Sequence, residues 1–102
     1  VPMEAGEGDD EYRAVFQKVL VPAADAFKPE FVIISAGFDA HRDDPLASMG
    51  LTEEGYADLT KIVAGIARQH CQGRLLSALE GGYNLTALAA SVERHIQALV
   101  AA

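Results

Sequence analysis

The 102-residue chain lacks several features that would identify a class of function at once. It has no tryptophan and one cysteine, Cys71, which excludes an internal disulfide and, by itself, a thiolate metal site. Basic residues are scarce, since 8 Lys and Arg stand against 15 Asp and Glu and leave a net charge of -7. Because phosphate contacts need clustered basic side chains, this balance argues against nucleic-acid binding.

Long hydrophobic runs are also missing. No apolar run approaches the ~20 residues of a membrane span, and the acidic amino end does not resemble a signal peptide. We therefore expect a soluble, cytoplasmic chain with no membrane partner. Half of the residues are apolar, which at this length is enough for at most one small domain.

Apolar residues at helical spacing predict a first helix from Asp9, with Asp9 or Asp10 as its cap. Pro22 lies inside this pattern and removes one backbone donor, so we expect the helix to kink or end near Val21. Before it, the segment 1–8 reads as a loop or an entering tail.

Two further helices are predicted. Thr52 is placed to cap the second, which should end within 69–73, and Asn84 is placed to cap the third, which should continue almost to the carboxyl end. The apolar stripe of the third helix comprises Leu85, Leu88, Ala89, Val92, Ile96 and Leu99.

Two short apolar runs, 31–34 and 75–79, predict buried strands, and a loop broken by glycine follows each one. The order helix, strand, helix, strand, helix indicates an α/β fold with parallel strands. Asp39 and Tyr83, 44 positions apart, would then face one crevice at the carboxyl ends of the strands. An equally good interpretation is that Asp39 is only a turn residue, because aspartate is common in loops. Two parallel strands normally belong to a larger sheet.

Three stretches resemble successive motifs of the histone deacetylase superfamily, in the branch of bacterial deacetylase-like and acetylpolyamine amidohydrolase proteins. They read Ser35-Ala-Gly-Phe-Asp-Ala-His-Arg-Asp-Asp-Pro-Leu46, Leu51-Thr-x-x-Gly-Tyr56 and Leu79-Glu-Gly-Gly-Tyr-Asn-Leu85. The resemblance covers nearly the whole chain. It implies that residues 1–102 form a single partial α/β domain, the carboxyl-terminal third of a deacetylase-like catalytic domain with the arginase/deacetylase-type three-layer α/β/α fold.

The resemblance also implies a function, a zinc-dependent amidohydrolase that removes acetyl groups from acetyl-lysine or acetylpolyamine. By this similarity Asp39 is a Zn²⁺ ligand, and Tyr83 is the catalytic tyrosine that hydrogen-bonds the substrate carbonyl and steadies the oxyanion. Leu46 forms a wall of the acyl-lysine tunnel, while Gly81 and Gly82 keep the backbone close to the substrate. These side chains suit a catalytic zinc, which takes three protein ligands and keeps one open position.

The family's first Asp-x-His metal pair and its tandem histidines have no counterpart in the sequence. Asp39-Ala-His41 has the same Asp-x-His pattern, but the residues around it match a later motif of the family, in which only the aspartate binds zinc. We therefore interpret His41 as a loop residue. We interpret His70 and His95 as solvent-facing or packing residues. One carboxylate cannot hold zinc, so we expect the chain alone to be inactive and to bind Zn²⁺ weakly or not at all.

The other charged residues of the central loop have no catalytic role in this interpretation. Asp43 and Asp44 are expected to shape the loop or to neutralise Arg42. Cys71 is expected to be structural.

Two functional interpretations stay open. In one, the chain is a fragment of a deacetylase-like hydrolase, and the activity belongs to the whole enzyme. In the other, it is a non-catalytic α/β module that self-associates or binds a protein. Because a two-stranded sheet exposes its edges and an apolar face, we expect a homo-oligomer in either case. The intact mass, compared with the length of the reading frame, distinguishes the two.

Overall fold

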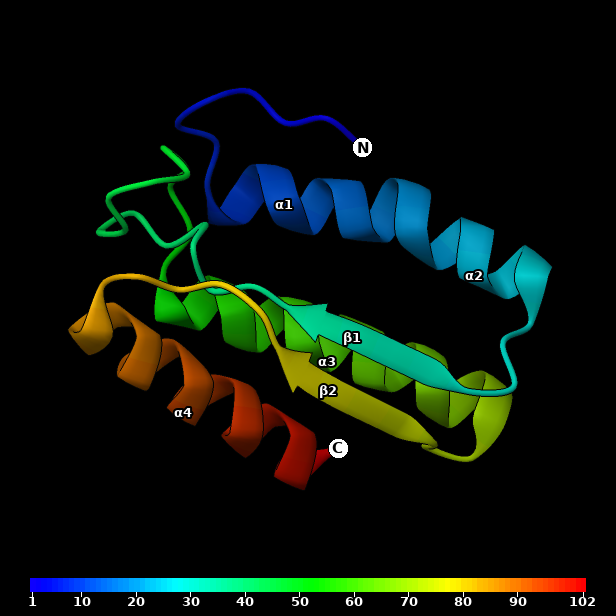
Figure 1. The fold of residues 1–102 in the computed structure, drawn as a ribbon. Helices are drawn as coiled ribbons and strands as arrows, with labels where there is room; N and C mark the ends of the chain where they lie inside the picture. The colour runs from blue at the N-terminus through cyan, green and yellow to red at the C-terminus, as the bar shows by residue number, and fades with distance from the viewer.

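The computed structural model describes residues 1–102 and contains the elements in the predicted order (Figure 1). In chain order these are α1 (Asp9–Val15), the π-helical segment η1 (Phe16–Leu20), α2 (Val21–Phe27), β1 (Val32–Ala36), α3 (Glu53–Cys71), β2 (Leu75–Leu79) and α4 (Leu85–Ala101). No helix is both long enough and apolar enough to cross a membrane.

The two strands pair in parallel, as predicted, in a register that runs from Val32 opposite Leu75 to Ala36 opposite Leu79. In Figure 1 both arrowheads point to the same end of the molecule, where the loops that follow β1 and β2 lie together. Helix α3 lies behind the sheet, with α1 and α2 along one side and α4 along the other. The parallel pairing therefore brings both glycine-broken loops to one edge.

Local signals predicted the starts of α3 and α4 correctly. The Thr52 hydroxyl accepts a hydrogen bond from the Gly55 N–H at 3.1 Å, and the Asn84 side chain accepts one from the Ala87 N–H at 2.9 Å. Each bond satisfies a backbone donor that has no partner inside the first turn.

The predicted cap of α1 was wrong. Gly8 occupies the cap position, and the Glu11 carboxylate accepts a hydrogen bond from the Gly8 N–H at 3.0 Å. The Asp9 carboxylate instead accepts hydrogen bonds from Thr52, so it joins α1 to the start of α3. A contact between residues 43 positions apart has no local signal.

The expected break near Val21 takes the form of a change in helix type. The chain stays helical to Phe27, but it passes through η1 before Pro22, which lies at the beginning of α2. Pro22 has no N–H to donate to the helical turn before it, and its ring crowds the carbonyl four residues back. The π-helical segment adjusts the backbone immediately before this position.

The prediction of fully buried strands was wrong for this chain. Ile33 is 71% exposed and Leu76, opposite it in the register, is 51% exposed. The helices cover only one face of the sheet, which leaves the other face bare (Figure 1). Within the strands, only Ala36 is fully buried.

The predicted stripe of α4 also differs from the buried one. The buried residues are small or polar, namely Ala87, Ser91, His95 and Ala98, whereas Leu85 and Ile96 are exposed. Small side chains allow α4 to approach α3 closely, because packed helices come nearest where side chains are short.

The core lies directly under the loop that follows β1. It is formed by Ala36, Phe38, Leu51, Tyr56 and Leu59, and the Phe38 and Tyr56 rings are tilted with centroids 5.0 Å apart. Tilted aromatic pairs at this separation are favourable. The loop therefore rests on a packed base that fixes the backbone around Asp39.

Candidate functional site

Backbone hydrogen bonds join the two loops at the carboxyl ends of the strands. The Glu80 N–H donates to the Ala36 carbonyl at 2.9 Å, and the Phe38 N–H donates to the Gly81 carbonyl at 2.8 Å. These bonds continue the β1–β2 ladder past the strands. The predicted metal ligand and the predicted catalytic tyrosine therefore lie on loops held side by side.

The Asp39 carboxylate lies against two glycines. A Cβ atom on Gly81 would stand 3.0 Å from Asp39 Cγ and 3.1 Å from each carboxylate oxygen, and one on Gly37 would stand 3.0 Å from Oδ1. Glycine at both positions therefore leaves room for the carboxylate. None of the side-chain hydrogen bonds or ion pairs of the structure uses Asp39, unlike the other carboxylates of this region, Asp44 and Glu53.

Tyr56 supports the Asp39 loop from below. Its hydroxyl accepts a hydrogen bond from the Ala40 N–H at 3.1 Å. Burial raises the pKa of the Tyr56 phenol, the Ala40 bond opposes that shift, and the negative charge of Asp39 raises the pKa further. The phenol is therefore neutral and acts as a fixed polar contact next to Asp39.

Tyr83 follows Gly81 and Gly82 in the loop after β2, and it is 56% exposed. Gly82 has a φ of +140°, and a Cβ there would stand 2.7 Å from Leu88 Cδ1. Only glycine combines that backbone conformation with so close a contact. In the structure, Gly81 makes room for Asp39 and Gly82 makes room for Leu88. The role of both glycines toward the substrate stays a prediction.

Asp44 connects the two loops, which the sequence did not indicate. Its Oδ1 accepts a hydrogen bond from the Leu46 N–H at 2.9 Å, and its Oδ2 accepts one from the Tyr83 N–H at 2.8 Å. The prediction that Asp44 shapes the loop is confirmed. The proposed tunnel residue Leu46, 66% exposed, is therefore fixed to the same carboxylate as Tyr83.

His41 is a loop residue, as predicted, and the structure shows that it is buried. The Asp43 N–H donates to His41 Nδ1 at 3.0 Å, so Nε2 carries the proton and donates to the Glu53 carboxylate at 2.8 Å. This bond lowers the pKa of Glu53, with smaller help from a backbone hydrogen bond. Both ring nitrogens are thus engaged in closing the loop onto α3.

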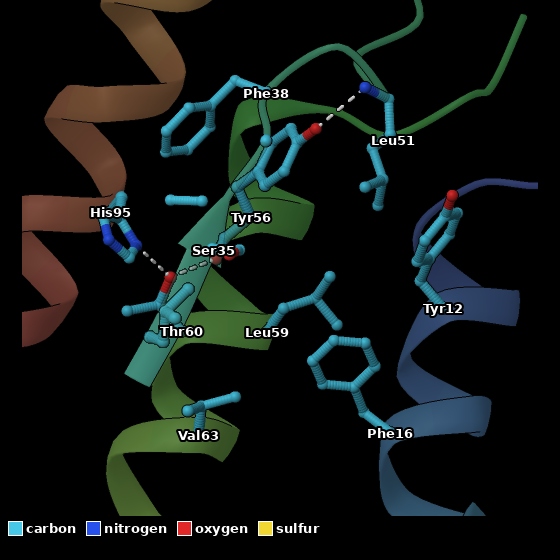
Figure 2. A pocket seen from close by; sticks show the side chains of 14 residues that line it. Tyr12, Phe16, Ser35, Phe38, Leu51, Tyr56, Leu59, Thr60, Val63 and His95 are labelled. Atoms are coloured by element: carbon cyan, nitrogen blue, oxygen red, sulfur yellow. Dashed lines mark hydrogen bonds between the residues drawn. The ribbon is translucent and has the colours of Figure 1, made fainter. Parts of the chain in front are cut away.

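The remaining histidines lie on helices, His70 on α3 and His95 on α4, and not on the two loops. His95 is a packing residue, with Nδ1 2.7 Å from the Thr60 hydroxyl (Figure 2). Its Nε2 lies 2.8 Å from the Ser77 hydroxyl. His70 Nε2 lies 2.8 Å from an Asp25 carboxylate oxygen on α2. Cys71 is buried, which agrees with a structural role.

A complete zinc site does not fit the residues of this chain. A catalytic zinc needs three protein ligands, and no group of three or more His, Cys, Asp and Glu side chains is placed to hold a metal ion. The unpaired Asp39 carboxylate, with the room that the two glycines leave, fits one ligand position. No metal-dependent step can be assigned to this chain by itself.

A hollow of about 180 Å³ lies between α1, β1 and α3 (Figure 2). Tyr12 and Phe16 face Leu59 across it, and Phe38, Tyr56 and His95 close its far end. None of the five predicted site residues lines it. It is incompletely filled core beneath the loop and does not form a substrate tunnel.

Comparison with known proteins gives a consistent family. The profile of the histone deacetylase domain matches residues 1–99. Histone deacetylase 14, chloroplastic, from Arabidopsis thaliana is 43% identical over 100 residues, which are 98% of this chain and 24% of that protein. A histone deacetylase-like amidohydrolase from Pseudomonas aeruginosa is 38% identical over 84 residues, which are 82% of this chain and 22% of that protein.

The fold agrees with the sequence comparison. The crystal structure of the HDA15 HD domain superposes with a TM-score of 0.88 at 45% identity, over 96% of this chain and 27% of that one. The chain thus spans about a quarter of the length of these proteins. The α/β arrangement matches part of a deacetylase domain, as predicted, whereas the compartment stays a prediction, because one of these relatives is named as chloroplastic.

Proposed function

The chain belongs to the histone deacetylase family, and we propose that it forms the carboxyl-terminal third of a deacetylase catalytic domain, to whose active site it contributes Asp39 and Tyr83. The substrate class is an acetylated amine, an acetyl-lysine side chain or an acetylpolyamine. The family is generally zinc-dependent, and a bound zinc would act as a Lewis acid toward the substrate carbonyl.

Each residue of the loop edge has one task in this proposal. Asp39 offers one carboxylate ligand to the metal, with other ligands supplied from outside this chain. The Tyr83 hydroxyl donates a hydrogen bond to the carbonyl oxygen, where negative charge develops during attack on the amide. Leu46 contacts the apolar part of the acyl-bearing chain, and its exposed side chain is free to do so.

One observation supports the proposal most strongly: hydrogen bonds join the loop that carries Asp39 to the loop that carries Tyr83. The Phe38 N–H bonds to Gly81 immediately before Asp39, and Asp44 holds the Tyr83 backbone on the other side. A metal ligand and an oxyanion donor need a fixed separation, because both must reach one carbonyl group. The unpaired carboxylate and the exposed phenol lie on a backbone that provides this rigidity.

A chimera tests the proposal. These 102 residues replace the matching segment of the HDA15 HD domain, and hydrolysis of an acetyl-lysine peptide and of an acetylpolyamine is measured with zinc content. We expect an active, zinc-containing chimera. Asp39→Asn should lose most of the zinc and the activity, because an amide oxygen is a weaker ligand than a carboxylate.

Asp43→Asn is the matched control, since the Asp43 side chain is 62% exposed and its carboxylate accepts no hydrogen bond from the Tyr83 loop. It should keep both zinc and activity. A well-folded Asp39→Asn chimera with full zinc and full turnover would refute the assignment of Asp39.

The bare face of the sheet favours a second candidate, a non-catalytic module that associates with a second copy of itself. Ile33 and Leu76 form adjacent exposed apolar positions on that face, and such patches mark interaction sites. This candidate predicts a stable oligomer of the chain and an inactive chimera.

A further inference from the structure

The Asp44 carboxylate has more backbone partners than any other side chain at the loop edge. It is 8% exposed, and its two oxygens accept hydrogen bonds from the N–H groups of Leu46 and Tyr83, which belong to different loops. The Asn84 side chain adds a third tie, because its Nδ2 donates to the Asp43 carbonyl at 3.1 Å. Tyr83 and the next residue, Asn84, are thus both connected to the loop that carries Asp39.

The charge of Asp44 is stabilised by these contacts. Burial raises the pKa of Asp44, but hydrogen bonds from the backbone N–H groups of Leu46, Tyr83, Asn84 and Ala47 outweigh burial and leave the pKa below its ordinary value. A carboxylate that accepts several backbone donors is held in its ionised form. Asp44 is therefore an anion that binds the loop backbone.

The Tyr83 side chain has no equivalent restraint of its own. It is 56% exposed, and its hydroxyl takes part in none of the side-chain hydrogen bonds of the structure, whereas its backbone N–H is fixed. The position of the phenol consequently depends on the backbone anchor. Leu46, 66% exposed, is anchored in the same way by the other oxygen.

We propose that Asp44 is a positioning residue for the reaction, which fixes Tyr83 and Leu46 relative to each other by bridging their backbone N–H groups with one carboxylate. The inference rests on the proposed function, since it assigns Asp44 to act through the phenol of Tyr83. A carboxylate is needed because both of its oxygens are acceptors. An amide would turn one N–H donor toward a backbone N–H.

The first test uses the 102-residue chain itself. Amide hydrogen exchange is followed by NMR in the wild type, in Asp44→Asn and in Asp43→Asn. We expect Asp44→Asn to speed exchange at the Leu46 or Tyr83 N–H by about tenfold or more, since a bond to a charged acceptor is lost. Exchange at α3 amides should be unchanged. Equal protection of both N–H groups in the wild type and in Asp44→Asn would overturn the proposal.

The second test uses the chimera and a double-mutant cycle. Asp44→Asn should lower kcat on the order of 10²-fold with normal zinc content, because a misplaced catalytic group loses about that much. In a Tyr83→Phe background the same substitution should have little further effect. An equal loss of kcat in both backgrounds would show that Asp44 does not act through Tyr83. An inactive wild-type chimera would count against the proposed function, and hydrogen exchange would then decide the positioning claim.

Discussion

The Asp9 carboxylate accepts two hydrogen bonds from Thr52, one from its backbone N–H at 2.8 Å and one from its hydroxyl at 2.6 Å. The pair joins α1 to the residue that caps α3. We expect Asp9→Ala to lower the free energy of unfolding by about 1.5–3 kcal/mol, the usual value of a hydrogen bond to a charged group. Urea denaturation measures this change.

Asp10→Ala is the control for that experiment. Asp10 is exposed and pairs only with Arg13, so its removal should cost less than about 1 kcal/mol. Equal losses for the two variants would contradict a structural role for the link between Asp9 and Thr52.

Gly55 should be coupled to Asp9. A Cβ on Gly55 would clash with the Asp9 carboxylate, so Gly55→Ala should destabilise the wild type although alanine has the better helix propensity. In an Asp9→Ala background the clash with the carboxylate is gone, and Gly55→Ala should cost at least about 1 kcal/mol less. Additive effects in a urea double-mutant cycle would refute this account.

His95 should make stability depend on pH. Burial lowers its pKa below the ordinary value of 6.5, so on acidification the unfolded chain takes up a proton before the folded chain does. Stability is therefore full above about pH 6.5 and falls as the pH drops from there through the lower folded pKa. The loss between about pH 7 and pH 5 should be smaller in His95→Gln than in the wild type. Parallel curves from thermal unfolding would contradict the prediction.

The bare sheet face predicts self-association of the isolated chain. Ile33→Lys combined with Leu76→Lys should shift the mass from light scattering to that of a monomer, because charges placed opposite each other on this face oppose its burial. Val100→Lys, at an exposed apolar position near the end of α4, is the control and should leave the mass unchanged. A monomeric wild type at micromolar concentration would refute the prediction.

Features with local causes could be predicted from the sequence. The caps at Thr52 and Asn84 follow from side chains that bond three residues ahead, and the strands follow from short apolar runs ended by glycine. Parallel pairing then brought the Asp39 and Tyr83 loops to one edge, which needed only the order of the elements.

Features that depend on distant contacts could not be predicted. The bridge from Asp44 to Tyr83 spans 39 positions, and nothing near Asp44 in the sequence indicates that its carboxylate meets the Tyr83 N–H. The prediction of fully buried strands was wrong for a related reason. The apolar pattern of β1 suits a sheet covered on both faces, whereas helices cover only one face here. The buried face of α4, which contains His95, could not be predicted because its small and polar residues do not form an apolar pattern.

The central claim is that Tyr83 supplies the oxyanion contact of a deacetylase site, and kcat of the Tyr83→Phe chimera tests it most directly. The change removes only the hydroxyl, so folding and zinc content should stay normal. We predict a fall in kcat of roughly 10² to 10³-fold, the usual cost of one oxyanion donor. An unchanged kcat, with normal zinc content, would contradict the account.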